Sequence, residues 1–360
     1  MPVLLLRSFR ACGIAVAVTA LTTGPVACGP SHEQAEHASA RTIPAESFTA
    51  AFSVVGRIRL EQPESAIVAR VSGVAVLQDG RIAVGDASEG KVKLYSRAGA
   101  LLRVIGRKGS GPGEFQTPRR VQQDERGRLH VFDTQLSRVT VLAPDGALVR
   151  TVTPDSVGYA TDFTRMADGS YVFATPGREA DGPITLHDSL GVLRSRLLRG
   201  FRIDVPQPDN PAWRTIEGMY ASAIGDTVYV TCTFCAQLAS VDVRRGTSRT
   251  ESLDFEGRIA PAPPGPDVRS VADIPAWTGS FHMTALVRTS ATGLLFTNMV
   301  RGILNYGDPN VLLLRDARGR WRAFADAPPV LAVSGDTLLA LVPDREGRSG
   351  EVVFEQFVER

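Results

Sequence analysis

The stretch QDGRIAVGDASEGKVKLYSRAGALLRVIG (78–106) aligns without a gap to ERGRLHVFDTQLSRVTVLAPDGALVRTVT (125–153). Gly127 and Asp133 of the second stretch lie 47 residues after Gly80 and Asp86 of the first. A glycine followed by an alternating apolar run recurs four more times, as GSYVFAT at 169, GDTVYVT at 225, GLLFTN at 293 and GDTLLALV at 335. Six copies, about 51 residues apart on average, indicate a repeat protein.

Each copy has the pattern of four short β-strands. In the second copy the expected strands are RRVQQDE, RLHVFDT, RVTVLAP and LVRTVTP, and Arg-Gly, Asp-Gly or Gly-Asp turns recur between strands along the chain. A single sheet of this size cannot bury both of its faces, whereas a ring of six sheets can. We therefore expect an all-β, six-bladed β-propeller with four antiparallel strands per blade. Its blades should cover about 64–115, 116–158, 159–205, 213–256, 278–328 and 329–360.

The last copy supplies only three strands, VLAVSG, TLLALVP and EVVFEQFV, before the chain reaches Arg360. A further strand pattern, FTAAFSVVGRIRLE (48–61), precedes the first blade. An N-terminal strand that completes the last blade would close the ring and cover an otherwise open sheet edge. The sequence therefore predicts one propeller domain over 47–360, with residues 48–61 in its last blade.

The N-terminal 27 residues have the pattern of an export signal. Arg7 and Arg10 precede ACGIAVAVTALTTG (11–24), a run of 14 apolar or small residues. A membrane-spanning helix needs about 20 such residues, so a signal peptide is favoured over a transmembrane segment.

The residues after this run resemble the end of a bacterial lipobox. Val26, Ala27 and Cys28 fit that pattern, and they predict a signal peptide over 1–27 and a lipid on Cys28. Pro25 stands where the pattern usually has Leu, so cleavage by the ordinary signal peptidase near Ala40 is the alternative. Residues 28–46 are polar and predict a flexible tether. The expected location is the periplasm or the outer membrane, with a lipid anchor as the only membrane contact.

The segment GSGPGEFQTPRRVQQDERGRLHVFDTQLSRVTVLAPDGALVRTV (109–152) resembles an NHL repeat. The matching features are G-x-G-P-G-x-F, a proline, an inner strand, D-x-x-G, an apolar strand ending in Asp, an Arg-Val strand and an Asp-Gly turn. The match is good over 71–152 and fades afterwards. This resemblance implies a six-bladed propeller of the NHL or a related exported type, an architecture shared by scaffolds, receptors, lactonases and lyases.

The glycine-rich segment IGRKGSGPGEF (105–115) joins the expected outer strand of the first blade to the inner strand of the second. It lacks both GK[ST] and a following helix, so a blade crossing is favoured over a phosphate-binding loop. Arg107, Lys108, Arg119 and Arg120 cluster around it. They predict either a basic face for an anionic ligand or acidic partner, or a solvated rim. The net charge of only +2 predicts no nucleic-acid partner.

Cys232 and Cys235 form a C-x-x-C pair at the end of an expected strand, where the second blade has Asp133. No following His and no second C-x-x-C completes a haem or zinc motif. In an exported protein a local disulfide is the leading interpretation, since Cα atoms across a turn can approach within the ~4.4–6.8 Å required. Free thiols, or a redox or metal role, are the alternatives.

Metal-dependent chemistry is the second functional hypothesis. No two histidines are spaced as ligands in the set His32, His37, His130, His187 and His282. The exported propeller lactonases hold calcium with acidic and amide side chains, for which the candidates are Asp124, Asp162, Asn298 and Asp326. No motif unites these residues, so we predict no cofactor and no catalytic residue, with Ca²⁺ as the alternative.

Two proline-rich insertions, RIDVPQPDNPAW (202–213) and GRIAPAPPGPDVRSVADIPAW (257–277), flank the fourth blade and end in Trp213 and Trp277. Both should project as surface loops from one sector of the ring. Their tryptophans are either exposed recognition residues or anchors that hold the loops.

Together these features predict a monomeric, envelope-anchored propeller that binds or scaffolds an envelope protein or an exported ligand. The alternative is an exported metal-dependent hydrolase or lyase, with the metal in the central channel. Nothing in the sequence identifies the ligand.

Overall fold

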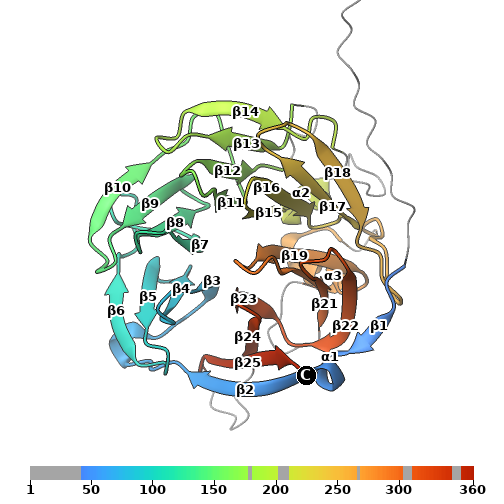
Figure 1. The fold of residues 1–360 in the computed structure, drawn as a ribbon, viewed down its shortest axis with the longest axis horizontal. Helices are drawn as coiled ribbons and strands as arrows, with labels where there is room; N and C mark the ends of the chain where they lie inside the picture. The colour runs from blue at the N-terminus through green and yellow to red at the C-terminus, as the bar shows by residue number, and fades with distance from the viewer. Residues whose placement is uncertain (1–41, 177–180, 202–210, 266–267, 303–309, 343–349) are drawn as a thin grey trace, which may run out of the picture. The chain divides into compact units, whose positions relative to one another are not determined.

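The computed structural model describes residues 42–176, 181–201, 211–265, 268–302, 310–342 and 350–360. They form six antiparallel sheets arranged in a ring, which confirms the predicted all-β, six-bladed propeller (Figure 1). The inner strands β3, β7, β11, β15, β19 and β23 contact one another in turn around the axis. Within the described part of the chain, no helix has the length and apolar character that crossing a bilayer requires.

Each blade runs from an inner to an outer strand in chain order. The strands of the first three blades are β3 (Val71–Val76), β4 (Ile82–Asp86), β5 (Lys91–Tyr95), β6 (Leu101–Ile105), β7 (Pro118–Gln123), β8 (Leu129–Asp133), β9 (Arg138–Leu142), β10 (Leu148–Val152), β11 (Asp162–Arg165), β12 (Tyr171–Ala174), β13 (Ile184–His187) and β14 (Leu193–Leu197). Those of the fourth and fifth blades are β15 (Met219–Ile224), β16 (Thr227–Cys232), β17 (Gln237–Asp242), β18 (Ser248–Ser252), β19 (His282–Thr289), β20 (Leu295–Arg301), β21 (Asn310–Arg315) and β22 (Trp321–Ala327). The predicted blade ranges contain these strands.

The sixth blade is built from both ends of the propeller. Its inner three strands are β23 (Val330–Ser334), β24 (Thr337–Val342) and β25 (Val353–Glu359), and its outer strand is β2 (Phe52–Arg59). β2 pairs antiparallel with β25 along its whole length. The predicted closure of the ring by an N-terminal strand is thus confirmed.

A short helix, α1 (Phe48–Ala51), precedes the closing strand and lies between blades five and six. The Phe48 ring is buried, and its centroid lies 4.6 Å from that of Phe52 and 5.1 Å from that of Phe357. Phe324 of blade five packs edge-on against the same group. This aromatic cluster joins the closing strand to the blades on both sides of the junction.

The segment before α1 differs from the expected tether, because residues 43–47 belong to the propeller. β1 (Ala45–Ser47) pairs in parallel with β22 and gives blade five a fifth strand. Ile43 is buried, and its backbone N–H donates to the Asp254 carbonyl at 3.0 Å. Glu46 forms an ion pair with Arg322, which also pairs with Glu359 of the closing blade.

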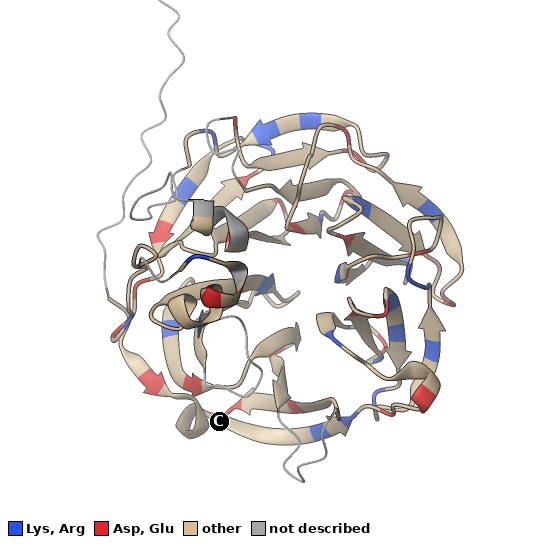
Figure 2. Ribbon diagram, turned by 180° about the vertical axis from the view of Figure 1, so that it is seen from behind, with Lys and Arg blue, Asp and Glu red and all other residues tan. Residues whose placement is uncertain are grey.

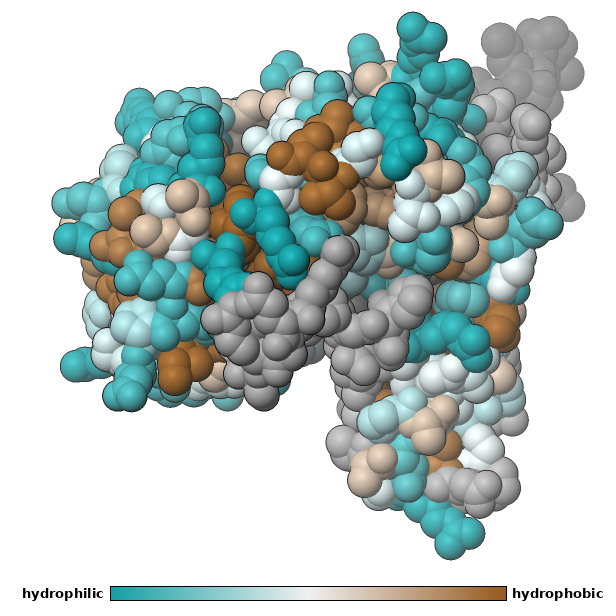
Figure 3. All heavy atoms as spheres, turned by 90° about the horizontal axis from the view of Figure 1, so that it is seen from below, coloured by the Kyte–Doolittle hydropathy of each residue, from teal (hydrophilic) through white to brown (hydrophobic). Residues whose placement is uncertain are grey.

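The two insertions carry the remaining helices: α2 (Pro211–Ile216), the 3₁₀ helix η2 (Val271–Asp273) and α3 (Ile274–Thr278), while a further 3₁₀ helix, η1 (Glu64–Ala66), follows β2. α2 leads into the inner strand of blade four, and α3 leads into the inner strand of blade five. Seen from the side, a lobe extends from one face of the ring where α2 and α3 lie (Figure 3). Residues 202–210 and 266–267 of the two predicted insertions lie outside the described residues.

Replacing Phe48 with Ala tests how much the junction contributes to stability. We expect Phe48→Ala to lower the free energy of unfolding by about 3–5 kcal/mol, because it leaves a cavity among buried aromatic rings. Urea denaturation would measure the change. Thr49→Ala, on the exposed side of the same helix, should cost less than about 0.5 kcal/mol. Equal losses in the two variants would show that the cluster does not secure the closing strand.

Candidate functional site

The centre of the ring contains two cavities of about 350 Å³ each, arranged along the axis. One cavity is lined by the first residues of the inner strands, including Val71 and Ser72, and the other by their last residues, including Val76. Arg119 and Arg288 line both cavities, together with Gly73, Val74 and Leu331. The two cavities therefore adjoin at these two arginines.

The walls of both cavities are basic. Arg70, Arg119, Arg120 and Arg288 line them, and among the described residues no Asp or Glu lines either cavity. Figure 2 shows basic positions on strands that surround the axis. Since a low-dielectric wall strengthens electrostatic interactions, this excess of positive charge favours an anion in the channel.

A single carboxylate, that of Asp162, joins four inner strands behind this wall. It accepts hydrogen bonds from Arg120 Nη1 at 3.0 Å, from Arg288 Nη1 at 3.0 Å and from the Ala221 N–H at 3.2 Å. Asp162 is buried in β11, while its partners lie in β7, β19 and β15. Such a buried carboxylate is stable because its lone pairs are satisfied by cationic and backbone donors.

The adjacent arginines of β7 differ in what they contact. Arg120 is buried, and it also donates to the Ala221 carbonyl at 2.8 Å and to the Ser222 hydroxyl at 3.1 Å. Burial, together with the nearby Arg288, lowers the pKa of Arg120 to about 9, so it is still charged at neutral pH. Arg119 is half-buried and forms no ion pair or side-chain hydrogen bond with any described residue. Arg120 therefore has a structural role, whereas Arg119 is available to a ligand.

The predicted basic face around the glycine loop is divided by the structure. Arg119 and Arg120 point into the channel region, whereas Arg107 is exposed and pairs with Glu114 at 2.6 Å. Lys108 donates to the carbonyls of Ala87 and Gln116. The two loop residues thus have partners within the described protein, whereas the two residues of β7 line the channel, and one ligand face formed by all four stays a prediction.

The glycine loop itself is a blade crossing, as expected, between β6 and β7. Gly106 has φ +76°, and a Cβ at this position would lie 2.6 Å from the Phe115 ring. Arg138 donates to the loop carbonyls of Ser110, Gly111 and Glu114. Arg138 of the second blade therefore holds the loop in place through its backbone carbonyls.

Trp213 and Trp277 are anchors, and their interpretation as exposed ligand contacts is wrong. Their exposed fractions are only 3% and 7%, and their ring centroids lie 4.9 Å apart. Phe234 and Phe281 complete this cluster, against which Ala285 of the channel wall packs. The two insertions bury their tryptophans against each other, beside one mouth of the channel.

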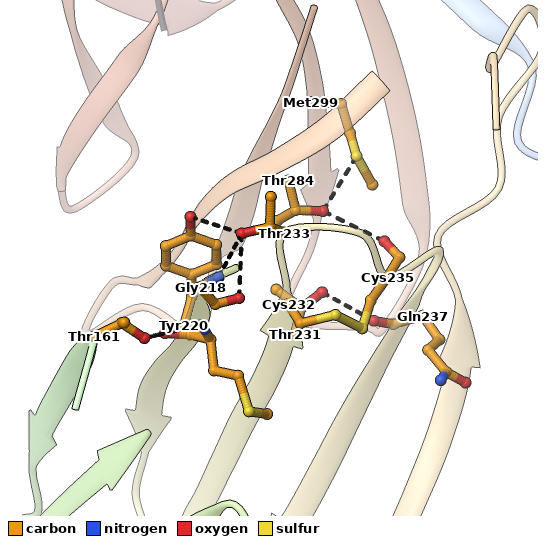
Figure 4. Close-up of a disulfide and its surroundings, with 11 residues drawn as sticks. Thr161, Gly218, Tyr220, Thr231, Cys232, Thr233, Cys235, Gln237, Thr284 and Met299 are labelled. Carbon is orange, nitrogen blue, oxygen red and sulfur yellow. Dashed lines mark hydrogen bonds between the residues drawn. A yellow bond between two sulfur atoms is a disulfide. The ribbon is translucent and has the colours of Figure 1, made fainter. Parts of the chain in front are cut away.

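The structure joins Cys232 and Cys235 in a disulfide with a Cα–Cα distance of 5.0 Å (Figure 4). In the second blade Asp133 occupies this place and accepts hydrogen bonds from the N–H groups of the crossing loop. In blade four the Thr233 hydroxyl instead accepts from the Gly218 N–H at 2.9 Å. The disulfide and Thr233 thus replace the aspartate that closes the hairpin in other blades.

The four residues considered as calcium ligands lie apart from one another and have other partners. Asp162 pairs with arginines in the channel, and Asp326 accepts from the Phe48 N–H at the start of α1. The Asn298 side chain donates to the Val330 carbonyl. Asp124 accepts from Arg128 and His130. Within the described ranges, no group of three His, Cys, Asp or Glu side chains could hold a metal ion.

His130 and Asp124 form a buried polar pair between blades two and three. His130 Nε2 lies 3.2 Å from Asp124 Oδ2, and its Nδ1 lies 2.9 Å from the Tyr171 hydroxyl. Burial lowers the pKa of His130 to about 4, although the contact with Asp124 raises it. Burial raises the pKa of Asp124, but hydrogen bonds from Arg128 and His130 outweigh it and lower the value to about 2. A neutral histidine beside a carboxylate fits a structural role here.

Sequence reasoning missed Arg288 and Arg70 as channel residues. Arg288 lies in ALVRT (285–289), near the end of the inner strand of blade five. Inner strands line the axis of a propeller, so charged residues on the expected inner strands could have been predicted to lie near the channel once the repeat was aligned. The pairing of Arg120 and Arg288 with Asp162 has no sequence signal, because the three belong to different blades.

The Asp162 network predicts a large effect from one small substitution. Asp162→Asn should lower the free energy of unfolding by about 3–5 kcal/mol, because it leaves two guanidinium groups without their carboxylate. Urea denaturation would measure the loss. Asp226→Asn, which breaks an exposed ion pair with Arg244, should cost less than about 1 kcal/mol. If both variants lost the same small amount, the channel ion pairs would contribute no more than a surface pair.

Comparison with known proteins supports the same architecture. Over residues 35–182 the chain is similar to a family, DUF5128, that is described as a six-bladed β-propeller. No curated protein matches the sequence.

Two solved structures from Bacteroides resemble the propeller. A member of the DUF4221 family from Bacteroides vulgatus has a TM-score of 0.63 at 10% identity, covering 86% of this chain and 99% of its own. A presumptive exported protein from Bacteroides fragilis has a TM-score of 0.60 at 13% identity, covering 89% of this chain and 99% of its own. At these identities the likeness establishes the fold alone, which is a six-bladed β-propeller.

Proposed function

We propose that this protein is an exported, lipid-anchored binding propeller whose axial channel holds a small ligand. Export and anchoring are supported by the basic and apolar pattern of residues 1–27, by Cys28 and by the polar segment that follows. The likeness to a presumptive exported propeller agrees with this location. The resemblance of residues 109–152 to an NHL repeat also supports this proposal.

The observation that carries the binding proposal is the pair of cavities that meet at Arg119 and Arg288. Binding sites for small ligands are concave, measure about 300–1,000 Å³ and combine apolar walls with a few polar groups. The channel has these properties. The helices α2 and α3 with Trp213 and Trp277, which we call the insertion lobe, lie beside one of its mouths. A metal-dependent hydrolase or lyase has no specific observation in its favour among the described residues.

Lipid attachment can be tested with two cysteine variants of the full chain. We expect the wild-type protein, expressed in a bacterium, to incorporate labelled palmitate and to sediment with membranes. Cys28→Ala should abolish both, because the thiol is the site of acylation. Cys12→Ala, inside the apolar run, is the matched control and should change neither. Labelling that survives Cys28→Ala would show that the anchor is elsewhere.

Ligand binding in the channel can be tested by filling it. The chain from Gly29 onward contains the whole compact unit 35–360 and can be screened against a metabolite library by thermal shift. Compounds that raise the melting temperature of the wild type should have no effect on Val74→Trp, because Val74 lines both cavities. Val104→Trp, on the exposed outer strand of the same blade, is the control and should respond like the wild type. Hits that stabilise both variants equally would place the site outside the channel.

A further inference from the structure

We infer that the channel binds an amphiphilic organic carboxylate. The carboxylate lies between Arg119 and Arg288, and the apolar part of the ligand lies along Val71, Leu286 and Leu331. This inference rests on the proposed binding function and adds the chemical class of the ligand.

The unused donors of the two arginines support the carboxylate. Arg288 donates through Nη1 to Asp162 and to the Val287 carbonyl, while its Nε and Nη2 bond to no described residue. Arg119 has all of its guanidinium donors free of described partners. A guanidinium presents parallel N–H groups that match the two oxygens of a carboxylate, so these free donors suit such a group.

The charge of the surrounding wall favours the same class. The guanidinium groups of Arg120 and Arg288 share the carboxylate of Asp162. Arg119 adds a third positive charge that has no acidic partner among the described residues. Arg70 adds a fourth positive charge at the mouth beside the insertion lobe, and no acidic side chain from the described part of the chain lines either cavity. An anionic group of the ligand would therefore replace the missing negative charge, whereas a cation would be repelled.

The apolar part of the ligand is indicated by the walls of the cavity nearest the insertion lobe. Val71, Leu286 and Leu331 line this cavity, and each is 8% exposed. Ala285 and Val74 extend the same wall. Covering such apolar surface is favourable by about 25 cal/mol per Å², so a hydrocarbon group gains more here than an inorganic ion can.

The test uses the chain from Gly29 onward and two pairs of probes, hexanoate with hexylamine and benzoate with benzamide. Isothermal titration at low ionic strength should detect binding of hexanoate and benzoate, and weaker or no binding of the amine and the amide. Arg119→Gln should weaken carboxylate binding at least about tenfold, since it removes a charge-assisted hydrogen bond. Added salt should also weaken it, because the attraction is partly electrostatic.

The controls separate loss of the site from loss of the fold. Arg119→Gln should keep the wild-type melting temperature, because no ion pair to a described residue is lost. Arg119→Lys should bind with intermediate affinity, since it keeps the charge but not the paired donors. Arg249→Gln, on the exposed outer strand of blade four, should leave the affinity within about twofold of the wild type.

Three outcomes would overturn the inference. Carboxylate binding that is unchanged in Arg119→Gln, or equal affinity for benzamide and benzoate, would show that the guanidinium groups do not select the ligand. Inorganic phosphate that binds as tightly as hexanoate would contradict the role of the apolar wall. In each of these cases, binding in the channel would still be supported if library compounds that stabilise the wild type failed to stabilise Val74→Trp. Library hits that stabilise Val74→Trp as well as the wild type would instead remove the proposed function itself.

Discussion

The propeller depends on the pairing of β2 with β25, which joins residues near the start of the domain to its last strand. Until that pairing forms, blade six has only three strands and the ring has two open ends. The Phe48 cluster fixes the closing strand against blades five and six. The channel is lined by inner strands that contact one another in turn around the whole ring, so its dimensions are defined only when the ring is closed.

At the axis the same side-chain type has two uses. Arg120 bonds to Asp162, to Ser222 and to the Ala221 carbonyl, and it thereby joins β7 to β11 and β15. Arg119, the next residue, lies at a register shift in β7 and has no described partner. One guanidinium therefore stabilises the ring, while its neighbour leaves an unbalanced charge where the two cavities share their lining.

Much of the fold could be predicted because the repeat is regular. The alignment of 78–106 with 125–153, at an offset of 47 residues, indicates strands in two blades, and the three strand patterns of the last copy indicate how the ring closes. The site was harder to predict, because its contacts join blades that are distant in sequence, as in Arg288 with Asp162. The register of β7 also shifts between Pro118 and Arg120, so Arg119 and Arg120 have different surroundings that the sequence pattern does not reveal.

The irregular segments were the least predictable. Trp213 and Trp277 are buried against each other, and neither insertion by itself indicates its partner. Likewise, the polar composition of 28–46 gives no sign that Ile43 and Glu46 bind to blades four and five. In both cases the outcome depends on a surface formed by other parts of the ring.

The attachment of residues 43–47 to blades four and five has a mechanical consequence. A pulling force applied to the chain before residue 42 reaches Ile43 and β1 before it reaches β2. The hydrogen bonds of β1 to β22 and the ion pair of Glu46 with Arg322 would then bear the load. The closing strand β2 would carry no tension until β1 had detached from β22.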